Sequence, residues 1–437
     1  MLKTIFGTDG IRCQMNSSYL TETNLIKLGQ AIAQWAPINS HFIFGSDTRA
    51  SCNTIKQIFS RELYNYNHKI SDAGDLPTPM LCELVENNAS YDFGIMITAS
   101  HNPAKDNGIK IITPIQKLTA SDELEISALF WGETKSLASS HEKKSAENLD
   151  PYETLRAYTS EIKKNLTRTK FDQFKIVIDC AHGATSFFAP QVFESFGFAV
   201  TTINNQPDGL NINKNSGALH PEQLIKKVVQ KNADFGCAFD GDGDRLVIVT
   251  PEGRILNGDD LLTVFAKHPN YQSEKIFAGT IMSNQAVENY FAKEGKQFIR
   301  TDVGDKNLVK ELATQNALLG TEPSGHLIMR DHSFCSDGIY SALLFFDTIL
   351  NNPGMQIPLF TPYPSVKKNI IVEEKKDLQE EKILKITKLY EKQLSPGRLI
   401  IRYSGTEPLL RIAIEHNDKE FAQKNLDSLV DELTPYL

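Results

Sequence analysis

Hydrophobic residues in the first third of the chain recur at two spacings, one typical of helices and one typical of buried strands. Leu25, Leu28 and Ile32 repeat at helical spacing, and the apolar run 41–44 follows them. A second helix is predicted near 53–66 and a second strand over 93–98. Strands that alternate with helices are typical of α/β layers. The pattern therefore predicts an α/β domain here.

The same alternation resumes after a polar stretch. Residues 135–149 are rich in Ser, Lys and Glu and show no periodicity, which predicts a surface connection between domains. A second α/β unit is then indicated. One helix is predicted to begin at Pro151 and another to lie over 224–229, and strands are predicted over 174–179, 234–239 and 246–249. A third α/β unit is predicted around 260–350.

The C-terminal part follows a proline-rich break. Pro353, Pro358, Pro362 and Pro364 crowd this connection. Helices are predicted near 377–393 and 419–434, and a strand over 398–403. We therefore expect four domains, which span residues 1–149, 150–254, 255–362 and 363–437.

The composition and charge exclude several classes of protein. The chain has 437 residues, too many for one ordinary domain, and 41% hydrophobic residues, too many for a wholly disordered chain. The formal net charge of −8 gives no broad basic surface, so no nucleic acid partner is expected. A small acidic ligand could still bind a local pocket.

Cysteine usage and hydropathy indicate the compartment. The six cysteines lie far apart and form no Cys-x-x-Cys pair, which excludes a disulfide scaffold or a zinc ribbon. The N-terminus lacks a signal-peptide core, and no apolar run approaches membrane-spanning length. We expect a soluble, cytoplasmic protein without a membrane partner.

The sharpest motif is an acidic loop between two predicted strands. Asp240, Asp242 and Asp244 alternate with glycines and are followed by Arg245. Carboxylates at alternate positions of such a loop can converge on one hard cation. A calcium-binding helix-loop-helix is excluded, because its sixth and twelfth positions would be Arg245 and Pro251.

A solvated acidic turn is the alternative interpretation of this loop. Three carboxylates this close repel one another without a cation, so metal binding is favoured. With only three protein carboxylates the ion needs another ligand, and a phosphate oxygen is the natural one for Mg²⁺.

A second motif, residues 98–103, lies at the end of the strand predicted over 93–98. Ligand and catalytic groups favour this end of a strand in α/β sheets. Ser100 is a candidate nucleophile, although a serine here is more often a turn residue, and His101 alone is more often structural. No Gly-x-Ser-x-Gly string is present, so acyl transfer is unsupported. Lys110 adds an amine a few residues later.

Two further segments offer ligand-binding groups. Around Gly405, hydroxyls and guanidinium groups could form a phosphate cradle or simply a surface turn; they belong to Arg402, Ser404, Thr406 and Arg411. The loop 320–326 carries Glu322, Ser324 and His326, which could hydrogen-bond sugar hydroxyls, although such loops are common without ligands. Neither a Walker A string nor a dinucleotide fingerprint occurs, so ATP and NAD are not indicated.

Taken together and in this order, the segments resemble the α-D-phosphohexomutase superfamily and, within it, the glucosamine branch. The likeness begins at residues 6–12, which contain Arg12, and runs to 411–415. Two stretches, 209–220 and 404–409, favour the glucosamine branch over the glucose/mannose branch. The resemblance implies an α/β fold of three related domains and a smaller C-terminal α+β domain around a central cleft.

The resemblance also implies roles for individual residues. Ser100 would be the phosphoserine carrier, and its phosphate would complete the shell of one Mg²⁺ on the three aspartates of the acidic loop. Glu322, Ser324 and His326 would bind the sugar. The non-transferred phosphate would be held by the cradle and by a further arginine, namely Arg402, Ser404, Gly405, Thr406, Arg411 and Arg245. Arg12, Lys110 and His101 are candidates for proton transfer.

The implied activity interconverts glucosamine 6-phosphate and glucosamine 1-phosphate through a sugar 1,6-bisphosphate, which also serves as activator. It would supply amino sugar for cell-wall precursor synthesis. The alternatives are a phosphomannomutase/phosphoglucomutase and a non-catalytic sugar-phosphate binder. The partner is a small sugar phosphate, and relatives suggest a homodimer.

Departures from the family pattern raise questions of selectivity and phosphate handling. They are Cys13, Ser46, Thr321 and Pro323, with Lys306 in place of an arginine. Because the carrier serine and all three acidic-loop carboxylates are present, an active enzyme is expected.

Overall fold

The structure is a computed structural model that describes residues 4–7, 9–132, 145–403 and 408–437. Its residues form two compact units. The first contains Met1–Ile281 and Arg300–Met355, and the second contains Met282–Ile299 and Gln356–Leu437. Among the described residues, every helix is too short or too polar to cross a bilayer.

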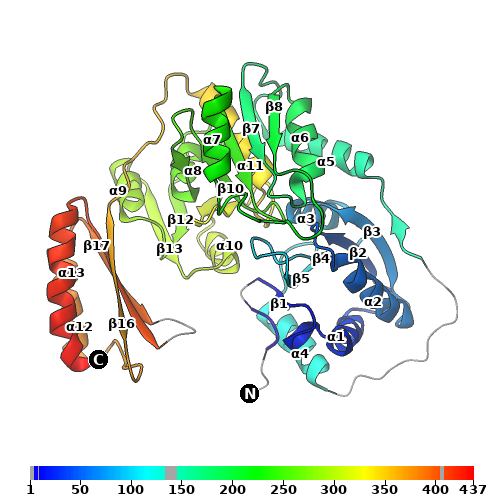
Figure 1. The fold of residues 1–437 in the computed structure, drawn as a ribbon, viewed down its shortest axis with the longest axis horizontal. Coiled ribbons are helices and arrows are strands. Elements are labelled where there is room, and N and C mark those ends of the chain that lie inside the picture. The colour runs from blue at the N-terminus through cyan, green and yellow to red at the C-terminus, as the bar shows by residue number, and fades with distance from the viewer. Residues whose placement is uncertain (1–3, 8, 133–144, 404–407) are drawn as a thin grey trace. The chain divides into compact units, whose positions relative to one another are not determined.

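The N-terminal part of the first unit is built on a six-stranded sheet of order β1-β5-β4-β2-β3-β6 (Figure 1). Its strands are β1 (Ile11–Gln14), β2 (His41–Ser46), β3 (Lys69–Asp75), β4 (Phe93–Ile97), β5 (Asp106–Ile112) and β6 (Glu147–Asn148). The helices beside it are α1 (Glu22–Trp35), α2 (Cys52–Asn65), α3 (Thr78–Asn87) and α4 (Ala120–Trp131), with the short η1 (Ser18–Leu20).

Helices cover both faces of this sheet. Apolar residues of α1, α2 and α4 share one core with Phe42 and Phe44 of β2. Successive strand residues face opposite sides, so Gly45 points to the other face, where Leu81 of α3 lies close to it. The helices predicted near 25–32 and 53–66 are confirmed as α1 and α2.

One element of this region was not predicted. At the end of the stretch 135–149, predicted as a surface connection between domains, Glu147 and Asn148 are exposed and form the edge strand β6, which pairs in parallel with β3 through Ser71 and Asp72. Two residues are too few to show a strand period, so no pattern in the sequence indicates this pairing. Residues 133–144 lie outside the described ranges.

The middle of the first unit has a five-stranded sheet of order β11-β10-β9-β7-β8. Its strands are β7 (Lys175–Asp179), β8 (Ala199–Ile203), β9 (Phe235–Phe239), β10 (Leu246–Val249) and β11 (Ile255–Leu256). Its helices are α5 (Pro151–Asn165), α6 (Thr185–Ser195) and α7 (Glu222–Lys231). The strands predicted on either side of the acidic loop are confirmed as β9 and β10; they pair in antiparallel register, so the loop closes a hairpin.

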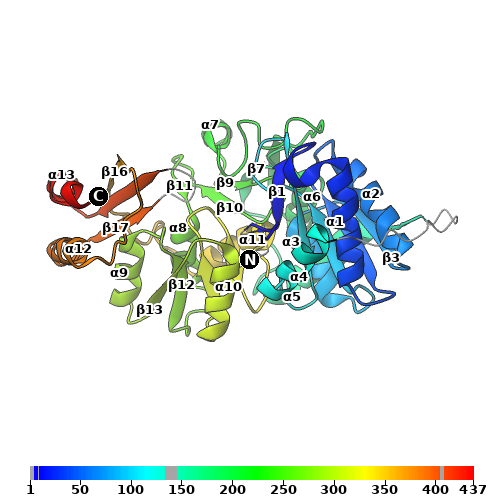
Figure 2. The ribbon, with the colours of Figure 1, turned by 90° about the horizontal axis from the view of Figure 1, so that it is seen from below.

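A third sheet has the order β13-β12-β14-β15. Its strands are β12 (Ile276–Thr280), β13 (Gln297–Thr301), β14 (Leu319–Thr321) and β15 (Leu327–Met329). Helices of the first unit in this region are α8 (Gly258–Phe265), α10 (Asp305–Thr314) and α11 (Gly338–Asn351). The loop 322–326 closes the antiparallel hairpin of β14 and β15. Figure 2 shows these elements from a second side.

The second unit contains a three-stranded antiparallel sheet of order β16-β18-β17. Its elements are α9 (Gln285–Lys293), β16 (Ser365–Ile371), α12 (Glu381–Gln393), β17 (Arg398–Tyr403), β18 (Leu409–Glu415), α13 (Lys419–Leu433) and η2 (Thr434–Tyr436). Leu410, Ile412 and Ile414 of β18 pack with apolar residues of α12 and α13 in one core. The predicted strand 398–403 is confirmed, whereas β16 and β18 were not predicted.

Tyr158 of α5 provides a test of packing in the first unit. It is buried, and its hydroxyl donates to both carboxylate oxygens of Asp337 at 2.9 Å. We expect Tyr158→Phe to lower the free energy of unfolding by about 1.5–3 kcal/mol, because a buried carboxylate loses a donor. Tyr152→Phe on the same helix, at an exposed position, should change it by less than about 0.5 kcal/mol. Equal denaturation midpoints for the two variants would contradict this account.

Candidate active site

The acidic loop and the serine motif come together although they are far apart in the chain. Ser100 follows β4, and its Oγ donates to Asp240 Oδ2 at 2.7 Å. The ligand oxygens of Asp240, Asp242 and Asp244 lie within 4.8 Å of one another, and all three residues are buried. The predicted nucleophile and the predicted metal ligands therefore share one site.

The backbone at Ser100 has an unusual conformation. Its φ of 50° lies in the left-handed region, which non-glycine residues adopt at some energetic cost. Its carbonyl accepts hydrogen bonds from Arg49 Nη2 at 3.1 Å and from Asn213 Nδ2 at 2.8 Å. The same two side chains donate to the carbonyl of Asn102. These bonds hold the loop in its turned conformation.

A close backbone approach lets the serine loop rest on the acidic loop. A Cβ atom placed on Gly241 would come within 2.5 Å of the Ser100 carbonyl oxygen. Glycine is therefore required between the first two aspartates by the packing of the two loops. This requirement is separate from metal ligation.

The three aspartates differ in their surroundings. Burial, reinforced by the other two carboxylates, raises the pKa of Asp240 to about 7. Burial also acts on Asp244, but Lys110 and His326 outweigh it and hold its pKa well below the usual value. Asp242 Oδ2 accepts from Thr78 Oγ1 at 2.6 Å and from Lys110. Asp242 Oδ1 is buried and has no hydrogen-bond partner among the described residues.

These observations fit a divalent cation. An unpartnered buried carboxylate oxygen is costly unless a ligand is provided for it. Oxygen donors without nitrogen or sulfur suit a hard ion such as Mg²⁺. The donor set of the acidic loop therefore matches the predicted metal.

Lys110 and Arg12 are close to the acidic loop through ion pairs. Lys110 Nζ lies 2.8 Å from Asp242, 3.0 Å from Asp244 and 2.9 Å from Asp9. Burial opposes its charge, but these carboxylates raise its pKa well above the usual value. Arg12 pairs with Asp9. Both cations thus lie within the carboxylate network.

His101 contacts the serine directly. Its Nδ1 lies 3.2 Å from Ser100 Oγ. Burial, with Arg245 and Arg12 nearby, lowers the pKa of His101 to about 4. Arg245 itself lies 3.7 Å from Asp240 Oδ2.

The loop predicted to bind sugar lies against the same carboxylates. His326 Nδ1 contacts Glu322 Oε2 at 2.6 Å, and its Nε2 contacts Asp244 Oδ1 at 3.2 Å. Burial opposes protonation, but Asp244 and Glu322 raise the pKa of His326 to about 10. Ser324 lies partly buried in the turn between the strands. Glu322 and His326 thus join the site, with the imidazole held between two carboxylates.

A cavity of about 590 Å³ lies beside the serine loop. His101 and Asn102 line one part of it, and the segment 210–220 lines the other. Its volume is within the usual range for small-molecule sites. The segment that suggested the glucosamine branch therefore lies next to the candidate nucleophile.

Three of the residues that depart from the family pattern make contacts within the first unit. Ser46 Oγ donates to Asp75 at 2.7 Å, and Cys13 Sγ faces the Ser17 carbonyl at 3.5 Å. Thr321 Oγ1 lies 3.2 Å from the carbonyl oxygens of Glu322 and His326. Thr321 thus supports the backbone of its own loop.

The predicted phosphate cradle belongs to the second unit. Arg402 of β17 and Arg411 of β18 are directly opposite each other in the antiparallel register. Directly opposite residues of an antiparallel pair project to the same face. Ser404, Gly405 and Thr406 lie outside the described residues.

Several contributors were missed from the sequence. Asp9, Thr78 and Asn213 contact the site residues directly, and Arg49 holds the serine loop. Asp9 and Asn213 lie in the segments 6–12 and 209–220 used for the resemblance, so their position there was the available signal. Arg49 lies three residues after Ser46, one of the departures from the family pattern. For Thr78 we find no signal in the sequence.

Comparison with known proteins decides the family. Four family models match in order, described as phosphoglucomutase/phosphomannomutase α/β/α domains I, II and III and the C-terminal domain; they cover residues 3–136, 156–253, 257–358 and 368–432. A phosphoglucosamine mutase of Hydrogenovibrio crunogenus is 36% identical over 440 residues, which is 98% of each chain. This chain belongs to the phosphoglucosamine mutase family.

Solved structures agree in fold. A phosphoglucomutase/phosphomannomutase family protein of Burkholderia thailandensis has a TM-score of 0.79 at 20% identity, over 100% of this chain and 98% of that one. The N-acetylphosphoglucosamine mutase of Aspergillus fumigatus, solved with GlcNAc-6P and magnesium, has a TM-score of 0.63 at 16% identity, over 99% and 96%. The predicted resemblance and the α/β fold class are confirmed for this member of the phosphoglucosamine mutase family.

Proposed function

We propose that this chain interconverts glucosamine 6-phosphate and glucosamine 1-phosphate through a phosphoserine enzyme. The observation that carries the proposal is the hydrogen bond from Ser100 Oγ to Asp240 of the buried acidic loop. It places a nucleophilic oxygen beside a cation site, which is the arrangement that phosphoryl transfer needs. The likeness to phosphoglucosamine mutases supplies the sugar.

The reaction comprises two transfers. In the first, the bond between phosphorus and Ser100 Oγ breaks, a bond from phosphorus to the sugar 1-oxygen forms, and the proton of the 1-hydroxyl passes to Ser100 Oγ. The resulting 1,6-bisphosphate reorients. In the second transfer, the bond between phosphorus and the sugar 6-oxygen breaks, a bond from that phosphorus to Ser100 Oγ forms, the serine proton passes to the 6-oxygen, and glucosamine 1-phosphate leaves. The side chains proposed to transfer these protons are those of Arg12, Lys110 and His101.

Asp240, Asp242 and Asp244 would hold one Mg²⁺, with Ser100 as a further ligand through its phosphate. When bound, the ion would neutralise negative charge on the transferring phosphoryl group. Glu322, Ser324 and His326 would bind the sugar. Their loop contacts Asp244 through His326, which supports this assignment.

The non-transferred phosphate is assigned to the second unit. Arg402, Ser404, Gly405, Thr406 and Arg411 would hold it. The register that pairs Arg402 with Arg411 supports this role, since two guanidinium groups on one face favour an anion.

The domain roles follow from these assignments. We propose a phosphoserine domain at 1–149, a metal-binding domain at 150–254, a sugar-binding domain at 255–362 and a phosphate-binding domain at 363–437. The ranges matched by the four family models fall inside these boundaries. A sugar 1,6-bisphosphate as activator, a homodimer and a cytoplasmic location complete the proposal.

A comparison of substrates tests the proposed sugar. We expect kcat/KM with Mg²⁺ and a bisphosphate activator to be at least about tenfold higher for glucosamine 6-phosphate than for glucose 1-phosphate or mannose 1-phosphate. Preference for glucose or mannose would move the chain to the sister branch. No turnover of any of the three, by protein shown to carry phosphate on Ser100, would favour a non-catalytic binder.

A further inference from the structure

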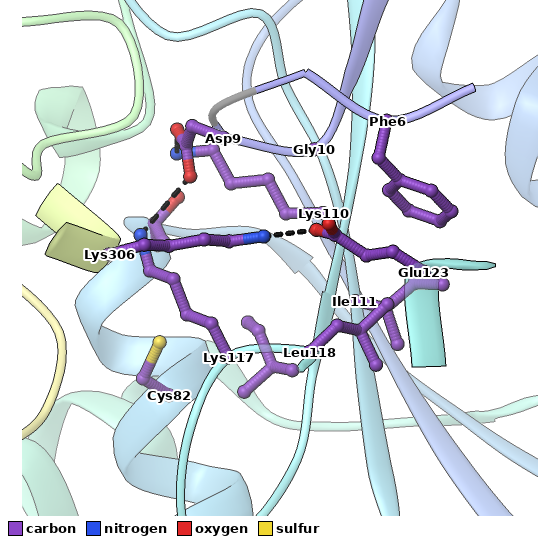
Figure 3. Close-up of a pocket in the computed structure, with 12 residues that line it drawn as sticks. Phe6, Asp9, Gly10, Cys82, Lys110, Ile111, Lys117, Leu118, Glu123 and Lys306 are labelled. Carbon is purple, nitrogen blue, oxygen red and sulfur yellow. Dashed lines mark hydrogen bonds and ion pairs between the residues drawn. The ribbon is translucent and has the colours of Figure 1, made fainter. Parts of the chain in front are cut away.

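A largely buried lysine outside the assigned site connects two of its parts. Lys117 lies between β5 and α4, and its side chain is only 14% exposed. Its Nζ donates to Asp9 Oδ1 at 3.1 Å and also to Asp305 Oδ2 (Figure 3 shows Lys117 reaching toward Asp9). Asp305 is the first residue of α10. The lysine thus joins the segment before β1 to the start of a helix from a different sheet region.

From Asp9 the connection continues to the acidic loop. Asp9 Oδ2 pairs with Lys110, which in turn pairs with Asp242 and Asp244.

From Asp305 the connection continues to the proposed sugar loop. Gly304, directly before Asp305, has a φ of 122°, which disfavours other residues at this turn. Its N–H donates to Glu322 Oε1 at 3.0 Å. The other oxygen of Glu322 contacts His326. The position of the 304–305 turn therefore sets the position of the Glu322 carboxylate.

The charge on Lys117 is maintained by its partners. Burial opposes protonation, but Asp305 and Asp9 raise the pKa of Lys117 well above the usual value. Removing the ammonium would leave two largely buried carboxylates without this cation, which is strongly unfavourable.

The cluster is too small to be a ligand pocket itself. The cavity drawn in Figure 3, which Asp9, Lys110 and Lys117 line, has a volume of about 20 Å³. That is space for about one water molecule. The residues here therefore act on one another rather than on a sugar phosphate.

We propose that Lys117 is a positioning residue that ties Asp9 to the 304–305 turn and thereby fixes Glu322 for sugar binding. The proposal rests on the function proposed above, in which Glu322 binds the sugar. Because Glu322 binds the sugar rather than the transferring group, its displacement should weaken binding more than chemistry.

Kinetics of Lys117→Met give the first test. We expect KM for glucosamine 6-phosphate to rise by about tenfold or more, with kcat within about threefold of wild type. Lys117→Arg, which keeps a cation with several donors, should recover most of the loss. If Lys117→Met fails to fold, Lys117→Gln provides the same comparison. A wild-type KM in the neutral variant, or an equal fall in kcat, would overturn the proposal.

A neighbouring ion pair supplies the matched control. Lys306 of α10 pairs with Glu123 of α4, which Figure 3 also shows, so this pair joins the same two regions. Lys117 contacts Asp9 and Asp305, the residue directly after Gly304. Glu123 contacts Lys306 instead. Glu123→Gln should therefore leave KM within about twofold of wild type. If Glu123→Gln raised KM as much as Lys117→Met does, any contact between the two regions would have the same effect, and the specific role proposed for Lys117 would be wrong.

Amide hydrogen exchange at Gly304 tests the geometry without turnover. Its N–H is bonded to Glu322, so we expect exchange to be faster in Lys117→Met than in wild type or Glu123→Gln. Unchanged exchange would overturn the proposed tie. Wild-type protein that does not turn over glucosamine 6-phosphate would refute the proposed function, while the exchange result would still decide the role of Lys117.

Discussion

Replacing Ser100 with alanine is expected to remove the phosphoryl group from the protein and to lower kcat by at least about 10⁴-fold. The hydroxyl oxygen is the only atom lost, and it is the atom that donates to Asp240. Alanine tolerates the left-handed backbone at this position no worse than serine, so the fold should persist. Intact-protein mass spectrometry and the coupled mutase assay would measure the two effects.

A serine outside the site provides the control. Ser90 is exposed and precedes β4, the strand that leads to Ser100. Ser90→Ala should retain both phosphate on the protein and full turnover. Substantial turnover by Ser100→Ala, or phosphate still present on that variant, would show that another residue carries the phosphoryl group.

Removing the acidic-loop charge at Asp242 is expected to have the next largest effect. We expect Asp242→Asn to lower kcat by about 10³-fold at fixed Mg²⁺, because one of three carboxylates that would hold the ion becomes neutral. The buried oxygen that has no partner among the described residues belongs to this side chain, which makes it the most informative of the three to change. Chelation of Mg²⁺ should abolish turnover in wild type.

Mg²⁺ binding can be measured without the reaction. An ion that binds only the folded protein raises the unfolding midpoint, so Mg²⁺ should stabilise wild type but not Asp242→Asn. Asp234→Asn, directly before β9 and outside the loop, should respond to Mg²⁺ like wild type. Stabilisation of Asp242→Asn equal to that of wild type would place the ion elsewhere.

The elements that position the candidate site residues were predictable because each has a strong local pattern. The apolar runs 93–98 and 246–249 contain the strands β4 and β10, and nearly all of their residues are buried. The acidic loop was identified from spacing alone, and the structure closes it as a hairpin between β9 and β10.

The missed elements are those whose stability comes from distant partners. β6 has two residues and exists through pairing with β3, so no local period reveals it. The boundary of α12 also differs: the helix predicted near 377–393 begins at Glu381. Asp377 instead forms a turn before the helix, in which its side chain accepts from the Gln379 N–H and its carbonyl accepts from the Glu380 N–H.

The site shows the same division between local pattern and distant contact. Ser100 and the three aspartates stand out as residue types in motifs. Lys117 does not, since its bond to Asp305 spans 188 positions in the chain. Such contacts depend on how separate sheets pack against each other, and no local pattern in one sequence predicts that packing.

The transfer of label from the protein to the sugar tests the central claim most directly. Protein carrying radiolabelled phosphate on Ser100 would be mixed with unlabelled glucosamine 6-phosphate and Mg²⁺, and the products would be followed through a single turnover. We predict that label appears first in the 1,6-bisphosphate and then in glucosamine 1-phosphate, while unlabelled phosphate replaces it on Ser100. Label that stays on the protein, or leaves only as inorganic phosphate, would contradict the proposal.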